Sequence, residues 1–193
     1  MFSQLNLNPD IIRALNDIDI TIPTPIQQKT IPVVLNSNDD ILALAQTGTG
    51  KTLAFGAPTL QLIDIKSKIP QMLIITPTRE LCLQISNDIC NFAKYITNIN
   101  VTSVYGGANI VSQIKSIRKG SQIIVATPGR ILDIINRNEI NLSNIKFIII
   151  DEADEMLNMG FIDDIEKILE CTPNNKRTFL FSATMPKEIL EIA

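Results

Sequence analysis

Short, mainly apolar runs alternate with longer stretches of helical periodicity along most of the chain. The runs predict buried strands, and they lie at residues 41–45, 72–76, 101–105, 122–126, 147–150 and 178–181. Between two of them, Leu81, Ile85 and Ile89 recur every four positions, as the apolar face of a helix does. Strands that alternate with helices form parallel sheets with helices on both faces, so the pattern predicts an α/β fold.

The predicted helices lie between these strands and at both ends of the chain. They are expected at residues 8–18, 26–35, 50–65, 79–94 and 110–117, with two more that start at Pro128 and Pro186. Thr127 is expected to cap the helix that starts at Pro128, because proline suits the first helical position. The helix after Pro186 meets no Gly or other stop signal before the C-terminus, so we expect the chain to be part of a longer one.

The first strand leads into a glycine-containing loop, Ala45-Gln46-Thr47-Gly48-Thr49-Gly50-Lys51-Thr52, and then into a helix. A strand, a loop ending in Gly-Lys-Thr and a helix together form a phosphate-binding loop. The glycines let successive N–H groups turn toward phosphate oxygens, and the helix directs its positive dipole end to the same place. Lys51 would bind the β and γ phosphates, and the Thr52 hydroxyl would ligate Mg²⁺. Ala45 stands where the strictest form of the pattern has Gly.

Composition narrows the possible functions. The net charge of −3 is not typical of a nucleic-acid binder, so any such surface must be local and rely on backbone contacts. No apolar run approaches the length of a membrane span, and residues 1–10 lack the features of a secretory signal. The chain has no His, which excludes His-based acid–base catalysis. Cys82, Cys90 and Cys171 are expected to be buried, reduced thiols of a cytoplasmic protein.

A polar cluster follows each of the six predicted strands. The clusters are the phosphate-binding loop, Pro77-Thr78-Arg79-Glu80, Gly106-Gly107, Thr127-Pro128-Gly129-Arg130, Asp151-Glu152-Ala153-Asp154 and Ser182-Ala183-Thr184. Because the carboxyl ends of parallel strands share one edge of a sheet, we expect all six clusters to line one surface.

Two of these clusters carry acidic and hydroxyl side chains. Asp151 and Glu152 end the most apolar strand, and beside a phosphate-binding loop they predict the second half of an NTPase site. Asp151 would hold Mg²⁺, usually through water, and Glu152 would orient or deprotonate the attacking water. Taken alone, the pair could equally be a helix N-cap. Ser182 and Thr184 are expected to hydrogen-bond Asp154, with helix capping as the alternative.

The motifs, taken in order, resemble the amino-terminal half of the DEAD-box ATP-dependent RNA helicases. Besides the six clusters, the resemblance rests on Pro23-Thr24-Pro25-Ile26-Gln27, and it covers residues 2–184. It implies that residues 1–193 form a helicase ATP-binding domain with a RecA-like parallel sheet and a Q motif at residues 2–27. It also implies a second RecA-like domain, which this chain does not contain.

The resemblance implies roles for individual residues. Gln27 would bind the adenine edge, and Phe2 would support the adenine pocket. ATP and Mg²⁺ would be the cofactors, bound by Ala45, Gln46, Thr47, Gly48, Thr49, Gly50, Lys51, Thr52 and Asp151, with Lys51, Asp151 and Glu152 catalytic. Asp154, Ser182 and Thr184 would couple the nucleotide to the RNA site. Single-stranded RNA backbone would lie along Pro77, Thr78, Arg79, Gly106, Gly107, Gln113, Thr127, Pro128, Gly129 and Arg130.

The chain departs from the family pattern at two positions and in its length. Asp19 and Ile20 stand where the family usually has Gly and an aromatic residue, and the hypothesis that follows is weaker ATP affinity or looser choice of base. The missing domain would carry an arginine finger, so we expect this monomeric chain to hydrolyse ATP very slowly and not to unwind RNA. Another class of P-loop ATPase and a non-catalytic, nucleotide-dependent binding module are the alternatives.

Overall fold

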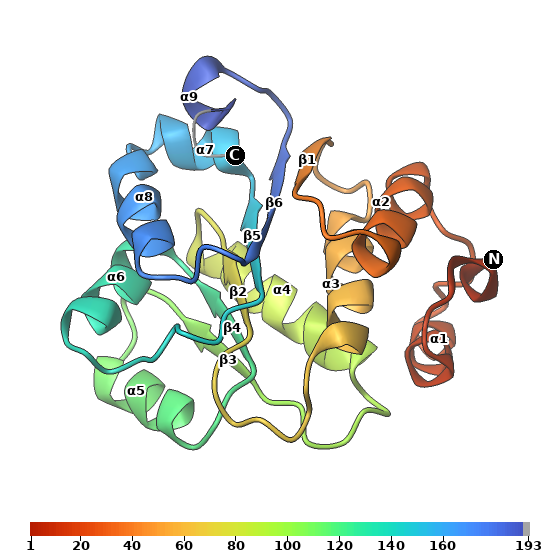
Figure 1. Ribbon diagram of the computed structural model, residues 1–193, viewed down its shortest axis with the longest axis horizontal. Coiled ribbons are helices and arrows are strands. Elements are labelled where there is room, and N and C mark those ends of the chain that lie inside the picture. The colour runs from red at the N-terminus through yellow and green to blue at the C-terminus, as the bar shows by residue number, and fades with distance from the viewer. Residues whose placement is uncertain (191–193) are drawn as a thin grey trace.

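The computed structural model of the protein describes residues 1–190 and contains one six-stranded sheet (Figure 1). The strands are β1 (Ile41–Leu44), β2 (Met72–Ile75), β3 (Val101–Val104), β4 (Ile123–Ala126), β5 (Phe147–Asp151) and β6 (Arg177–Ser182). They lie in the order β1-β6-β5-β2-β4-β3, and every pair is parallel. Each strand begins and ends within one residue of its predicted bounds, so the predicted parallel α/β fold is confirmed.

Helices cover both faces of the sheet. They are η1 (Phe2–Leu5, a 3-10 helix), α1 (Pro9–Asn16), α2 (Pro25–Asn36), α3 (Lys51–Leu62), α4 (Arg79–Phe92), α5 (Ile110–Arg118), α6 (Pro128–Asn136), α7 (Ala153–Asn158), α8 (Ile162–Glu170) and α9 (Lys187–Leu190). The sequence analysis did not predict η1, α7 or α8. Residues 191–193 of the last predicted helix lie outside the described residues.

Alternating side chains of the central strands supply two hydrophobic cores. Phe147 and Ile149 of β5 pack with α1–α4 on one face, whereas Ile148 and Ile150 pack with α5–α8 on the other. Figure 1 shows these two groups of helices on opposite sides of the sheet. Because both faces are covered, the strand needs no polar alternation, which explains its four consecutive large apolar residues.

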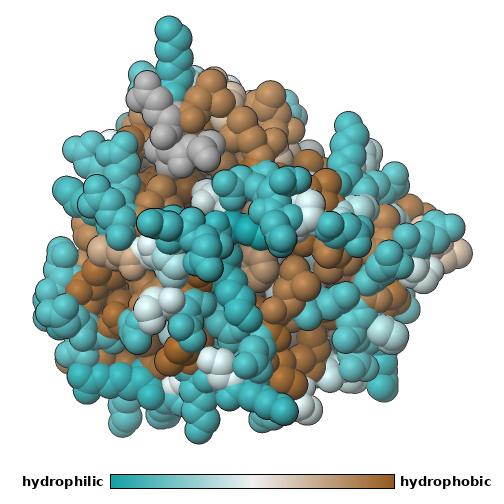
Figure 2. Space-filling view, in the orientation of Figure 1, coloured by the Kyte–Doolittle hydropathy of each residue, from teal (hydrophilic) through white to brown (hydrophobic). Residues whose placement is uncertain are grey.

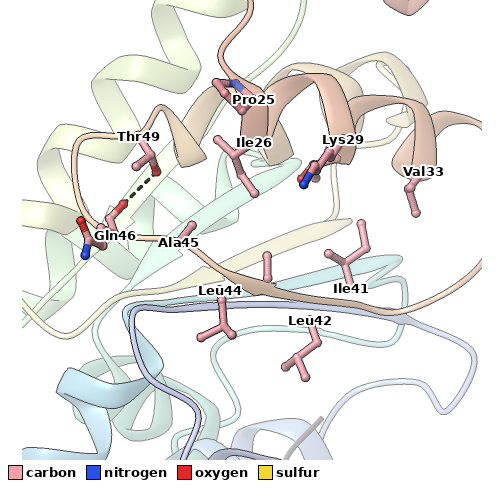
Figure 3. Close-up of a pocket in the computed structure, with 12 residues that line it drawn as sticks. Pro25, Ile26, Lys29, Val33, Ile41, Leu42, Leu44, Ala45, Gln46 and Thr49 are labelled. Atoms are coloured by element: carbon pink, nitrogen blue, oxygen red, sulfur yellow. Dashed lines mark hydrogen bonds between the residues drawn. The ribbon is translucent and has the colours of Figure 1, made fainter.

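Strand β1 forms one edge of the sheet and is covered on one face only. Its Leu42 and Leu44 are exposed, and Figure 3 shows them on the side of β1 opposite Ile26 and Val33 of α2. An apolar cavity of about 640 Å³ lies between α2 and β1.

In Figure 2, brown residues also surround the C-terminal end of the described chain, at the top of the view, while teal residues cover most of this face.

Arg177, at the start of β6, ties this edge to helix α2. Its guanidinium donates hydrogen bonds to the carbonyl oxygens of Val34 (2.8 Å) and Asp39 (3.1 Å), and it is stacked over the ring of Phe179. The side chain therefore satisfies the Val34 carbonyl in the last turn of α2, which the helix leaves without a partner, and the Asp39 carbonyl in the segment before β1.

The expectation of burial is wrong for two of the three cysteines, whereas Thr127 does occupy the predicted N-cap position. Cys82 is buried, which raises the pKa of its thiol to about 11, but Cys90 and Cys171 are exposed. Cys90 lies on the outward face of the amphipathic helix α4. Thr127 is the N-cap residue of α6, but its side chain makes no capping hydrogen bond. No helix in residues 1–190 is long and apolar enough to cross a membrane.

Candidate functional site

The six polar clusters lie at the carboxyl ends of strands that all run in one direction. The register pairs Leu44 of β1 with Ser182 of β6, and Ile75 of β2 with both Ala126 of β4 and Ile150 of β5. The loops that follow these strands therefore leave the sheet at one edge. The predicted single surface is present.

The phosphate-binding loop turns into α3 at Gly50. Gly50 is the N-cap residue of α3 and has a φ of 87°, a left-handed conformation that glycine adopts at little cost. A Cβ atom at this position would lie 2.4 Å from Nε2 of Gln27. The backbone conformation therefore favours glycine here, and any side chain would also displace the amide of Gln27.

Gln27 joins the start of α2 to this loop. Its Oε1 accepts a hydrogen bond from the backbone N–H of Thr24 (2.9 Å), and its Nε2 donates one to the carbonyl oxygen of Gly50 (3.0 Å). Thr24 adds a third link, because its hydroxyl donates to the carbonyl oxygen of Thr49 (2.9 Å). The amide of Gln27 retains one N–H and one lone pair for another partner.

A cavity of about 360 Å³ extends from this loop toward α4. It is lined by Ile18, Ile20, Gln27, Thr47, Gly48, Gly50, Lys51, Thr52, Leu53, Leu81, Gln84, Asp88, Phe92, Asp151 and Glu152. Of the residues predicted to bind nucleotide, Ala45, Gln46 and Thr49 line the other cavity, beside α2 and β1 (Figure 3). Phe2 lines neither cavity and lies in the hydrophobic core.

Sequence reasoning missed most of the wall that α4 contributes to this cavity. Leu81, Gln84, Asp88 and Phe92 recur at intervals of three or four residues, which places them on one side of α4. The helical spacing was visible in the sequence. Nothing in the sequence showed that this side faces the phosphate-binding loop.

Asp19 and Ile20 stand at the two positions where the chain departs from the family pattern. Asp19 has a φ of 59°, and Asp is one of the few residues other than Gly that adopt this conformation readily. Ile20 lines the cavity with its aliphatic side chain. The backbone therefore keeps its turn without Gly, while the cavity wall lacks an aromatic ring at this point.

A buried ion pair links the phosphate-binding loop to β5. Nζ of Lys51 lies 2.9 Å from Oδ1 of Asp151, and both side chains are less than a tenth exposed. Burial raises the pKa of Asp151, and the positive charge of Lys51 offsets part of that effect. Lys51, predicted to bind phosphate, and Asp151, predicted to bind the metal, therefore neutralise each other where they line the cavity.

Glu152 follows Asp151 in a strained backbone conformation. Its φ is 57°, and its N–H donates a hydrogen bond to Oδ1 of Asp151 (3.0 Å). It is the N-cap residue of α7, but its side chain makes no capping hydrogen bond, which argues against a purely capping role. Burial, followed by the charge of Asp151, raises the pKa of Glu152, so its carboxylate is a stronger base than an exposed one.

Asp154 connects β5 to the end of β6. Its carboxylate accepts hydrogen bonds from the backbone N–H (3.0 Å) and the hydroxyl (3.1 Å) of Thr184. Its backbone N–H donates to the hydroxyl oxygen of Ser182 (3.1 Å). Partial burial favours the neutral acid, but the bonds from Ser182 and Thr184 hold the pKa of Asp154 below its usual value. The three residues predicted to interact are in contact.

The loops after β2, β3 and β4 hold the residues predicted to bind RNA. Nη1 of Arg130 donates to the carbonyl oxygen of Ala108 (2.9 Å) and to Oε1 of Gln113 (3.0 Å). Nε2 of Gln113, a buried side chain, donates to the carbonyl oxygen of Tyr105 (3.1 Å). Arg130 and Gln113 therefore brace the loop that carries Gly106 and Gly107.

Two glycines at this edge have no structural reason to be glycine. Gly106 and Gly129 do not have left-handed φ angles, and a Cβ atom at either would meet no heavy atom within 4 Å. Gly129 even lies inside α6, where Gly is less favourable than Ala. Neither the fold nor packing within the described residues requires them.

Breaking the buried ion pair should destabilise the chain in a pH-dependent way. We expect Lys51→Met to lower the free energy of unfolding by about 3 kcal/mol near neutral pH, because it leaves a buried carboxylate without its cation. The folded-state pKa of Asp151 would rise further above its unfolded value, so the loss should shrink as the pH falls toward 4. Urea denaturation at several pH values measures it.

The exposed pair between Lys94 and Asp17 is the matched control. Lys94→Met should cost much less stability than Lys51→Met, since solvent screens that pair. An equal loss for both variants, or a Lys51→Met loss that does not vary with pH, would contradict this account of the buried pair.

Known proteins share both the sequence and the fold. A family model described as DEAD/DEAH box helicase matches residues 24–192. The chain is 46% identical over its whole length to "ATP-dependent RNA helicase DeaD" of Mycobacterium tuberculosis, and 50% identical over 99% of its length to "ATP-dependent RNA helicase CshA" of Listeria monocytogenes. It covers 34% and 36% of those proteins, about a third of their length.

Solved structures agree with this assignment. The crystal structure of a DEAD box protein from the hyperthermophile Methanococcus jannaschii matches with a TM-score of 0.95 and 48% identity, over 100% of this chain and 52% of that one. A hypothetical ATP-dependent RNA helicase from Sulfolobus tokodaii matches with a TM-score of 0.88, 42% identity and coverage of 96% and 54%. With a family model that spans most of its length and a fold shared with solved members, the chain belongs to the DEAD/DEAH box helicase family.

Proposed function

We propose that the chain is the ATP-binding half of an ATP-dependent RNA helicase, which binds Mg-ATP and single-stranded RNA backbone at one edge of its sheet. The observation that carries this proposal is the contact between Lys51 and Asp151, with Glu152 beside them, in a cavity at the same edge as the glycine loops. The names of the relatives supply the class of reaction.

The residues around the phosphate-binding loop suit a magnesium-bound triphosphate. No group of three or more His, Cys, Asp or Glu side chains within residues 1–190 could hold a metal alone. Mg²⁺ is commonly held by one or two carboxylates together with substrate phosphates, and the cavity offers Asp151 and the Thr52 hydroxyl. Thr52 and Asp151 would hold Mg²⁺, whose charge would offset that of the phosphates.

A bound triphosphate would rearrange the ion pair at the floor of the cavity. Lys51 would exchange the Asp151 carboxylate for phosphate oxygens, which leaves that carboxylate free for the metal. Glu152 would take a proton from the attacking water, and its raised pKa makes it a better acceptor. Positive and negative charges thus stay paired before and after binding.

The remaining N–H and lone pair of Gln27 suit the adenine edge, which presents one acceptor and one donor to an amide. Guanine has an acceptor, O6, at the position where adenine has its N6 donor, so it cannot form the same pair of hydrogen bonds. Gln27 would therefore select ATP over GTP and, through its bond to Gly50, respond to the loop that holds the phosphates.

The RNA surface would depend on backbone and helix termini more than on basic side chains. Gly106 and Gly129 leave open space where a ribose-phosphate backbone can come close. Helices α4 and α6 begin at this edge, and their first N–H groups can bind phosphate oxygens. This arrangement reconciles RNA binding with a net charge of −3.

The nucleotide selectivity of Gln27 gives the first test. The parent chain should bind Mg-ATP more tightly than Mg-GTP, and Gln27→Met should bring the two dissociation constants within about twofold of each other. Isothermal titration calorimetry measures both. The ratio is the readout, because damage to the loop alone would weaken both nucleotides equally. A selectivity that survives Gln27→Met would show that another group reads the base.

Gly129→Ala separates RNA binding from stability. The substitution should raise the free energy of unfolding by up to about 1 kcal/mol, because Ala is the better helix former. It should also weaken binding of a single-stranded oligouridylate severalfold, since the new methyl group enters the space left for RNA. Fluorescence anisotropy and urea denaturation measure the two effects. Asn136→Ala, at the far end of α6, is the control and should leave RNA binding unchanged; unchanged binding by Gly129→Ala would remove this surface from the proposal.

Hydrolysis by the 193-residue chain should be very slow, because an arginine finger from a second domain contributes about 10³- to 10⁵-fold where it has been measured. Single-turnover assays with the chain in excess over labelled ATP measure the residual rate. Glu152→Gln should abolish that rate while preserving ATP binding. With Glu152 as the base, the rate should fall as the pH drops through its raised pKa, above the usual range for Glu. Fast, RNA-stimulated turnover by the chain alone would refute the need for a second domain.

A further inference from the structure

We propose that Tyr105 is a positioning residue that holds the guanidinium of Arg79 ready for an RNA phosphate. The guanidinium carbon of Arg79 lies 4.9 Å from the centroid of the Tyr105 ring. The two residues belong to different loops of the strand-end surface, since Arg79 starts α4 after β2 and Tyr105 follows β3. The inference rests on the proposed function and assigns a role to a residue that none of the motifs includes.

Arg79 has a free charge at an exposed position. Its side chain makes no ion pair with an acidic residue among residues 1–190, although other arginines do so, such as Arg137 with Asp133. An exposed arginine samples many rotamers, and each must be lost when the side chain binds a ligand. The face of an aromatic ring restrains a guanidinium without neutralising it, so the fork of N–H donors remains available.

The side chain of Tyr105 packs against the hydrophobic core, and its backbone is held by a series of hydrogen bonds. Its backbone carbonyl accepts from Gln113, whose Oε1 accepts from Arg130 of the loop after β4. Through Tyr105 this series of contacts reaches Arg79, and it therefore joins the loops after β2, β3 and β4. The Tyr105 hydroxyl makes no hydrogen bond within the described residues, which leaves the ring face as its contribution.

The consequence is that Tyr105 should contribute to RNA affinity only through Arg79. A guanidinium that is already oriented loses less conformational entropy when it forms two parallel hydrogen bonds to a phosphate. Without the ring, Arg79 would keep its charge but lose its preferred position. The two residues should then behave as one unit toward RNA, while Mg-ATP, bound in the cavity near Lys51, should be unaffected.

A double-mutant cycle tests this with the 193-residue chain and a labelled single-stranded oligouridylate at low salt. Tyr105→Leu should weaken RNA binding about threefold to tenfold, the range expected from the cost of ordering one long side chain. Tyr105→Phe, which keeps the ring, should stay within about twofold of the parent. In an Arg79→Ala background, Tyr105→Leu should cause no further loss. Both Tyr105 variants should keep the parent's Mg-ATP affinity, which shows that they are folded.

Four results would overturn the proposal. An equal loss from Tyr105→Leu in the Arg79→Ala background would mean that the ring contacts RNA directly. A Tyr105→Phe loss as large as that of Tyr105→Leu would assign the effect to the hydroxyl. Full RNA affinity in Tyr105→Leu would show that the ring has no role. The RNA surface of the proposed function would then still be tested separately by Gly129→Ala. A parent chain that binds Mg-ATP but no RNA at any salt concentration would overturn the RNA surface itself, and this inference with it.

Discussion

The common direction of the six strands is the constraint on which the rest of the structure depends. In a parallel sheet every strand ends at the same edge, so groups that are far apart in the sequence become neighbours without any long-range polar contact to bring them together. The strands can run this way because both faces are covered, and the two hydrophobic cores on either side of β5 stabilise that arrangement. Burial of the apolar strands therefore positions the segments that follow them, and these segments carry the polar side chains of the site.

At that edge, polar groups from different segments bind one another, and a bound ligand would replace one member of such a pair. Lys51 and Asp151 satisfy each other in a buried position, Gln27 bonds the carbonyl of Gly50, and Asp154 bonds Thr184. Each contact joins two different segments of the chain at this edge, so a ligand that replaces one partner acts on both segments. In the proposed function, phosphates bound at one of these segments would act through these contacts on the loops proposed to bind RNA. In the proposed function, a chain with a net negative charge offers such a surface because backbone N–H groups and restrained arginines would bind the phosphates.

Most of the fold could be predicted from the sequence, because strand positions depend on local apolar runs and the edge follows from their alternation with helices. Other features depend on tertiary contacts that no local pattern shows. Cys90 has helical spacing with apolar residues but lies on the outward face of α4, and Phe2 packs in the core instead of the cavity. Ala45, Gln46 and Thr49 belong to the phosphate-binding motif but line the cavity beside α2. The contact between Arg79 and Tyr105 joins two loops whose distance the sequence does not define.

Mapping both ligands onto the backbone amides by NMR tests the central claim most directly, that one strand edge binds ATP and RNA through neighbouring loops. Mg-ATP should shift the amides of the loop after β1, the start of α2 and residues 151–154, and a single-stranded oligouridylate should shift those of the loops after β2, β3 and β4. Shifts concentrated around the cavity between α2 and β1, or RNA shifts on the helical faces far from this edge, would contradict the account.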